Sequence, residues 1–138
     1  MKLVVDSNIL VLFFRDNPIQ RIIVNSKSFS LRLYAPEYAL EELAKNKADI
    51  IKYSGETEKE FKTHLNKLKG LITFVNRNKF RAFEKKAKEL APHDKDIPFF
   101  ALVLKLNACI WSNEIAFTKQ SVVSIFRTQE LIELIEFE

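Results

Sequence analysis

The sequence predicts an α/β protein, a three-layer α/β/α sandwich with a parallel sheet of about five strands, formed by residues 1–138 as a single domain. Short apolar segments alternate with helix-like segments along the whole chain, a pattern typical of strands joined by helical crossovers. The first apolar segment, Leu3–Val5, ends abruptly at Asp6, as expected of a buried parallel strand. A length of 138 residues, 47% of them hydrophobic, suffices for one core, and no linker or internal repeat interrupts it.

Proline, glycine and short polar residues mark the boundaries of the elements expected in the first half of the chain. Ser7 or Asn8 can cap the first helix, and Pro36 stops the second strand and suits the first turn of the next helix. The expected elements are a strand at Leu3–Val5, helices at Ile9–Phe14 and Ile19–Asn25, a strand at Leu31–Ala35, and a helix from Glu37 to Tyr53 with Gly55 as its C-cap.

The second half continues the alternation. The expected elements are a helix at Thr57–Leu68 with Gly70 after it, a strand at Leu71–Val75, a helix at Lys79–Leu90 stopped by Pro92, a helix at Pro98–Leu106, strands at Ala108–Trp111 and Val122–Phe126, and a closing helix at Thr128–Ile135. Residues 98–106 are almost wholly apolar, so this helix should be buried on most sides. Thr128 is expected to be the N-cap of the last helix, with Glu130 close behind it.

Composition narrows the class of protein. No apolar run is long enough to span a bilayer, and Asp6 interrupts what would be the apolar core of a signal peptide, so a cytoplasmic protein without a membrane partner is expected. The single cysteine, Cys109, excludes an internal disulfide. The two histidines, His64 and His93, lie far apart and have no Cys partners, which argues against a zinc site.

The net charge of +4 is unevenly distributed. From Lys45 to Lys105, 15 Lys and Arg outweigh 8 Asp and Glu for a net charge of +7, which leaves −3 on the rest of the chain. A basic middle attracts phosphate backbones. Solvated helix faces account for the charge alone at least as well.

Acidic residues gather where the expected strands end. They are Asp6 after the first strand, Glu41 and Glu42 on the helix after the second, Asp94 and Asp96 before the buried helix, and Glu114 after the fourth strand. Ligands of open α/β sheets bind beyond the carboxyl ends of the strands. Carboxylates that converge there repel one another unless a hard cation such as Mg²⁺ or Mn²⁺ joins them, and such a metal activates water toward a phosphodiester.

Each acid also has a purely structural explanation. Asp6, Asp94 and Asp96 stand where helix caps are common, and a glutamate on a helix is most simply a solvated residue. The helical wheel separates the two glutamates, because Glu41 falls beside Lys45 and Lys52, whereas Glu42 falls on a less charged face. The joint placement of the acids, more than any one of them, indicates a metal site that includes Glu42.

Other chemistries lack their motifs. The only glycines are Gly55 and Gly70, so the chain has neither a P-loop nor a G-x-G-x-x-G turn. It has no G-x-S-x-G elbow for a serine nucleophile.

Five segments, in order, resemble the motifs of PIN domains. They are Leu3–Leu10, Tyr34–Leu43, Asp94–Leu104, Ile110–Glu114 and Thr128–Ile132. The resemblance covers almost the whole chain and implies a PIN-like fold and an Mg²⁺- or Mn²⁺-dependent ribonuclease, a group that includes the VapC toxins of toxin–antitoxin pairs.

The resemblance also implies roles for particular residues. Asp6, Glu42 and Asp96 match the metal-binding acids of the family, and Glu114 stands where an aspartate is more common. Asp94 is a weaker match, and Asn8 and Ser112 match polar residues that support the acids. Ala116 stands where related sequences often carry another aspartate. This difference leaves open whether the site holds one metal or two and whether the protein is active.

We therefore expect an endoribonuclease for single-stranded RNA, with lysines of the basic middle positioning the backbone. One alternative is an inactive PIN fold that binds RNA or protein, and another is a phosphotransfer domain on a flavodoxin-like sheet. The sequence leaves open whether the protein binds an antitoxin protein and whether it forms a homodimer. The closing segment, with Leu131, Ile132, Leu134, Ile135 and Phe137, is expected to pack mostly on the sheet.

Overall fold

The computed structural model describes residues 1–136 and contains a five-stranded sheet in which every pairing is parallel. Its strands are β1 (Lys2–Val5), β2 (Arg32–Pro36), β3 (Thr73–Val75), β4 (Cys109–Trp111) and β5 (Ile125–Phe126). Their order in the sheet is β3-β2-β1-β4-β5. The predicted fold class is confirmed, and the order differs from the 2-1-3-4-5 order of flavodoxin-like sheets, which removes the basis of the phosphotransfer alternative.

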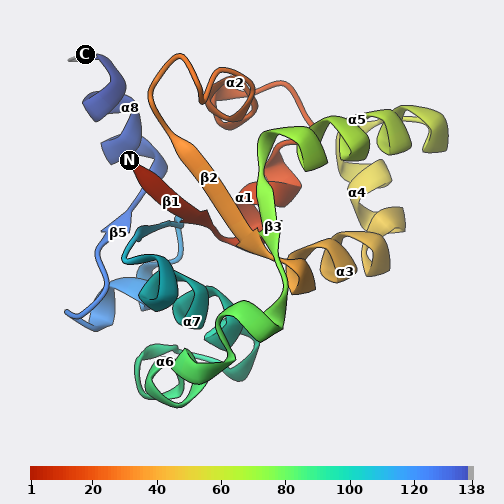
Figure 1. Cartoon of the computed structure of the whole chain (residues 1–138). Coiled ribbons are helices and arrows are strands. Elements are labelled where there is room, and N and C mark those ends of the chain that lie inside the picture. Colours follow the sequence, from red (N-terminus) through yellow and green to blue (C-terminus); the bar gives the residue numbers. More distant parts are fainter. Residues whose placement is uncertain (137–138) are drawn as a thin grey trace.

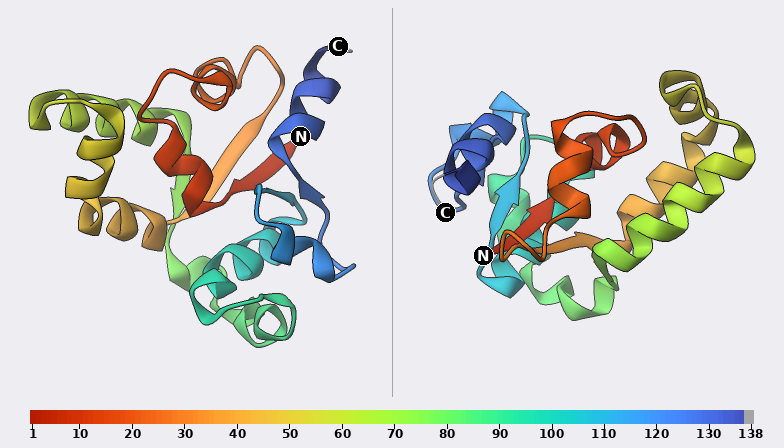
Figure 2. Two further views of the ribbon diagram at one scale, coloured as in Figure 1. Left: turned by 180° about the vertical axis from the view of Figure 1, so that it is seen from behind. Right: turned by 90° about the horizontal axis from the view of Figure 1, so that it is seen from above.

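Helices cover both faces of the sheet. They are α1 (Ser7–Leu12), α2 (Pro18–Val24), α3 (Glu37–Lys45), α4 (Lys47–Ser54), α5 (Glu58–Leu71), α6 (Glu84–Leu90), α7 (Ile97–Leu106) and α8 (Thr128–Glu136). In Figure 1, α1 and α2 lie on one side of the sheet and α6 and α7 on the other. Helices α3, α4 and α5 form an arm that projects beyond the β3 edge, as both views of Figure 2 show. Within residues 1–136, no helix has the length and apolar character needed to cross a membrane.

The position of Asp6 depends on β1, the central strand of the sheet. Leu3, Val4 and Val5 are all fully buried, because helices pack on both faces of this strand. The apolar run stops where the strand reaches the edge of the core, so the next residue, Asp6, lies at its carboxyl end.

The packing of helix α7 fixes the position of a second acid, Asp96, which directly precedes this helix. Five consecutive residues, Phe99 to Val103, are buried, and the helix packs against β1, β2 and β4. Asn107 ends the helix in the left-handed region with φ 51°, a conformation that asparagine tolerates better than most residues. The predicted burial of this helix is confirmed, and its packing fixes the segment that carries Asp96.

The helix predicted from Glu37 to Tyr53 is two helices. Asn46 separates α3 from α4 with φ −99° and ψ 16°, outside the helical region. Asparagine competes poorly for helix interiors, and a residue of this type at a bend is favourable. Gly55 caps α4 with φ 74°, as predicted.

The helix predicted from Lys79 to Leu90 is also shorter than expected. Two 3₁₀ turns, Arg77–Lys79 and Arg81–Phe83, precede α6, and Phe80 between them has φ −126°. Phe80 is only 2% exposed. Bending the chain there buries its ring, a packing demand that local helix propensity does not reveal.

Three further boundaries differ from the prediction. Helix α5 continues through Gly70 to Leu71, so β3 begins only at Thr73, and β5 is two residues long. At the start of α8, the Arg127 N–H donates to Glu130 and the Thr128 N–H to Asn113, which places the expected cap one residue too late. Phe137 lies outside the described residues.

Replacement of Leu102, a fully buried residue of α7, should destabilise the fold strongly. We expect Leu102→Ala to lower the free energy of unfolding by about 3 kcal/mol, through lost burial and the cavity left behind. Leu134→Ala on α8, where the side chain is 38% exposed, is the matched control and should change it by less than about 1 kcal/mol. Urea denaturation measures both, and equal losses would contradict the assigned core.

Candidate active site

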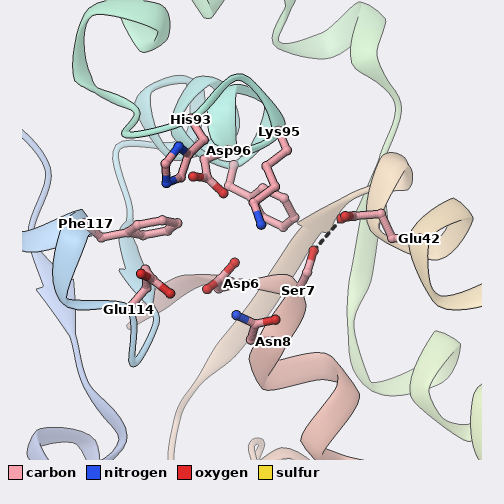
Figure 3. Close-up of a pocket in the computed structure, with 10 residues that line it drawn as sticks. Asp6, Ser7, Asn8, Glu42, His93, Lys95, Asp96, Glu114 and Phe117 are labelled. Carbon is pink, nitrogen blue, oxygen red and sulfur yellow. Dashed lines mark hydrogen bonds between the residues drawn. The ribbon is translucent and has the colours of Figure 1, made fainter. Parts of the chain in front are cut away.

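A polar cavity of about 110 Å³ opens at the carboxyl ends of β1 and β4. The strand order reverses between these two strands, which is where ligands of open α/β sheets bind. Figure 3 shows the cavity and the side chains around it. It is lined by Asp6, Ser7, Asn8, Glu42, His93, Lys95, Asp96, Phe99, Glu114 and Phe117.

Asp6 is held in place by the neighbouring strand. Val5 pairs with Trp111 in the β1–β4 register, and the Asp6 N–H donates to the Trp111 carbonyl at 3.0 Å. The next residue of that chain segment, Ser112, donates its hydroxyl to Asp6 Oδ2 at 2.8 Å. Both side chains are buried, so parallel strand pairing positions the carboxylate with little freedom.

Capping does not explain Asp6. It is the residue before α1, but its side chain makes no capping hydrogen bond. Burial raises its pKa from the ordinary value of 3.8 to about 6, and the charges of Asp96 and Glu114 add to the rise. The Ser112 hydroxyl and the Ser7 backbone act in the opposite direction.

Asp96 faces Asp6 from the other layer of the fold. It ends a 3₁₀ turn, Asp94–Asp96, directly before α7, is 6% exposed and makes no side-chain capping bond. Burial is the largest cause that raises its pKa, and Glu114 contributes to the rise, whereas Lys95 and His93 lower it. The structural explanation by capping therefore fails for Asp96 as well.

Glu42, on α3, enters the cavity from the side of the projecting arm. Its Oε1 accepts a hydrogen bond of 2.5 Å from the Ser7 hydroxyl on α1 (Figure 3). The helical wheel placed Glu42 on the correct face, because Glu41 is exposed and lines a different hollow with Tyr38. Ser7, expected only as a helix cap, instead donates a hydrogen bond to this glutamate.

The remaining predicted residues divide into two groups. Glu114 lines the cavity from the loop after β4, and its N–H donates to the Ser112 hydroxyl at 3.0 Å. Asn8 lines the cavity from α1. Asp94 is exposed and does not line the cavity, and neither does Ala116.

Two buried carboxylates here have no cation partner. Within residues 1–136, no Lys, Arg or His nitrogen lies within 4.0 Å of Asp6 or Asp96. In the same part of the chain, no three His, Cys, Asp or Glu side chains are grouped closely enough to hold a metal ion as they stand. The donors themselves fit a hard divalent cation, because every acid of the cavity offers carboxylate oxygens and two of them are desolvated.

Five residues of the cavity were missed as site residues: Ser7, His93, Lys95, Phe99 and Phe117. Phe99 and Phe117 are each 1% exposed and form an apolar wall, which sequence alone cannot distinguish from ordinary core. The spacing of His93 and Lys95 before Asp96 was the available signal, since the turn carries all three to one place.

These observations define a three-layer α/β protein that has an acidic cavity where its strand order reverses. The PIN domain family model matches residues 4–135. The chain therefore belongs to the PIN domain family, whose members are in general nucleases that use divalent metals.

The fold also matches a solved structure. A chain of the crystal structure of VapBC2 from Rickettsia felis bound to a DNA fragment from their promoter superposes with a TM-score of 0.69. The match covers 92% of this chain and 98% of that chain at 14% sequence identity, which supports the fold. No curated protein sequence matches the chain significantly.

Neutralising Asp6 should stabilise the metal-free protein. The folded state raises the pKa of Asp6 to about 6, so this group favours folding below about pH 4, and that contribution is lost as the pH rises through 6. In EDTA at pH 7, Asp6→Asn should raise the free energy of unfolding by about 2 to 3 kcal/mol, since Ser112 can still donate to the amide oxygen.

The gain should shrink toward zero as the pH falls to 4. Urea denaturation at pH 4 to 7 measures this difference between variant and parent. Asp49→Asn is the control, because Asp49 is exposed on α4, and its effect should be small at every pH. A destabilised Asp6→Asn at pH 7 would contradict the assigned electrostatics.

Proposed function

We propose that this PIN domain is a metal-dependent endoribonuclease that hydrolyses phosphodiester bonds in single-stranded RNA in the cytoplasm. Asp6, Asp96, Glu42 and Glu114 are the proposed ligands of Mg²⁺ or Mn²⁺, and Ser112, Ser7 and Asn8 support them. The observation that carries this proposal is the pair of buried carboxylates, Asp6 and Asp96, which face one cavity without a cation partner.

Burial without a counter-ion is costly, and a fold retains such a cost where a ligand removes it. Three acids reach the cavity from distant segments, Asp6 after β1, Asp96 before α7 and Glu114 after β4, and Figure 3 shows them pointing toward a common space. A cavity of about 110 Å³ has room for a cation and one phosphate group.

The residues of the chain have distinct tasks in this reaction. Asp6 and Asp96 supply fixed negative charge, and Ser112 holds the Asp6 carboxylate in one orientation. The wall formed by Phe99 and Phe117 lowers the local polarity and strengthens the electrostatic interactions in the cavity. A divalent cation bound by these acids would lower the pKa of a water, so that the water can lose a proton and attack the phosphodiester, and it would stabilise the leaving oxygen.

A role as the toxin of a toxin–antitoxin pair is part of the proposal. Its support is the similarity in fold to a chain of the VapBC2 structure, which contains a pair of proteins bound to DNA from their promoter. The corresponding partner of this chain would be an antitoxin protein, and a homodimer is a further proposed assembly.

One observation favours a second candidate, a PIN domain that binds RNA or protein without cutting it. The acids of residues 1–136 do not form a ready cluster of three, and Glu42 is already engaged by Ser7. A site that never gathers its ligands would keep the fold and lose the chemistry.

The two candidates differ in a cleavage assay. We expect the protein to cut a fluorescently labelled single-stranded RNA with Mn²⁺ and not with EDTA. Asp6→Asn should lower the rate by about 100-fold or more, because it removes a fixed ligand charge. Asp16→Asn is the control, since Asp16 is exposed and pairs with Arg21 away from the cavity, and it should cut like the parent.

Metal binding gives an independent readout. Electron paramagnetic resonance of Mn²⁺ should show binding by the parent protein and much weaker binding by Asp6→Asn and Asp96→Asn. Binding of RNA with neither cleavage nor Mn²⁺ uptake would establish the binding module instead.

A further inference from the structure

A lysine points into the acidic cavity. Lys95 belongs to the 3₁₀ turn Asp94–Asp96, and Figure 3 shows its nitrogen directed between Asp96 and the Ser7–Glu42 pair. The residue is exposed, so its ammonium group reaches the cavity from the solvent side. It is a cation among four acids that line the same space.

Lys95 does not form an ion pair with these acids. In the part of the chain that the structure describes, no carboxylate oxygen lies within 4.0 Å of its nitrogen, although five ion pairs of that length occur elsewhere. Among the described residues, none accepts a hydrogen bond from the Lys95 nitrogen either. The ammonium group is thus near enough to affect Asp96 through its charge and far enough to remain available to a ligand.

The turn presents its side chains selectively. His93 and Lys95 line the cavity together with Asp96, whereas Asp94 between them is exposed and lies outside it. The N-terminus of α7, a ten-residue helix, begins at the same turn and adds partial positive charge. One rim of an otherwise acidic cavity is therefore electropositive.

We propose that Lys95 binds a non-bridging oxygen of the RNA phosphate that lies in the cavity, and that His93 flanks the same phosphate on this rim. The proposal deepens the proposed function and rests on it. An ammonium group has three donors and no acceptor, so it requires an anion that brings its own oxygens. A phosphodiester is such an anion, and a cation on the wall lowers the repulsion that the four acids exert on it.

This contact does not require a metal. The four acids of the cavity can hold a phosphate only through a bound cation, whereas the Lys95 ammonium group attracts it directly. RNA binding by Lys95 should therefore persist in EDTA, where cleavage stops. This separates the role of Lys95 from the roles of Asp6 and Asp96.

The test compares Lys95→Met with Lys27→Met. Methionine keeps much of the length of the side chain and removes the charge. Lys27 is also an exposed lysine, beside Met1 and Ser30 at the opposite, amino end of the sheet. Fluorescence anisotropy would follow binding of a labelled single-stranded RNA in EDTA, where cleavage stops, over a series of salt concentrations.

We expect Lys95→Met to weaken binding about tenfold and to reduce the slope of log K against log salt by about 0.7, the value for one lost contact to a single strand. Lys27→Met should bind like the parent, and Lys95→Arg should recover most of the affinity because it keeps the charge. Equal affinity and equal salt slope for Lys95→Met and the parent would overturn the proposal.

The RNA-binding comparison in EDTA remains informative if the proposed nuclease function is wrong. A parent protein that never cleaves RNA disproves the nuclease, whereas the binding comparison in EDTA still decides whether Lys95 contacts the backbone. In the active protein, Lys95→Met should raise KM for RNA more than it lowers kcat, and it should leave Mn²⁺ binding in place. Loss of Mn²⁺ binding in that variant would also overturn a role in phosphate binding.

Discussion

The hydrogen bond from Ser112 to Asp6 is the interaction on which the cavity depends. It joins residues 106 positions apart in the sequence, across the junction of β1 and β4. The parallel register that pairs Val5 with Trp111 brings the next residues of both strands side by side. Since the strand order reverses at this junction, no crossover helix covers the space beyond it, and the cavity opens there.

This placement has an electrostatic cost that the fold accepts. Asp6 is desolvated and lies near two other acids, which is why its pKa rises to about 6 although Ser112 donates to it. The surrounding core, with β1 and α7 fully packed, is extensive enough to hold a carboxylate in so unfavourable a position. Proteins commonly accept an unfavourable arrangement of charges at a functional site and offset its cost in stability by packing elsewhere.

The sequence predicted the parts of this arrangement that follow from local patterns. An apolar run ending at Asp6, an apolar helix after Asp96 and the wheel position of Glu42 together indicated that acids meet near the sheet edge. The 3₁₀ turns around Phe80 were not predictable, because they serve to bury its ring. The break at Asn46 was not predicted, because asparagine is only mildly unfavourable inside a helix and does not by itself mark an end. Lys95 was missed because its spacing before Asp96 was the only signal, and that spacing alone does not reveal which way a lysine points.

The four acids differ in how firmly they are held, and this difference bears on how a cation would enter. Asp6 and Asp96 are short, buried and carried by β1 and the start of α7, whereas Glu42 and Glu114 have longer side chains on the rim. Four carboxylates fixed at ligand distance would repel one another strongly in the metal-free protein. Two fixed acids and two adjustable ones avoid most of that repulsion, because the glutamates need to approach only when a cation offsets the charge. If Glu114 is a ligand as proposed, its extra methylene would give it the reach to approach a cation from a loop instead of a strand end.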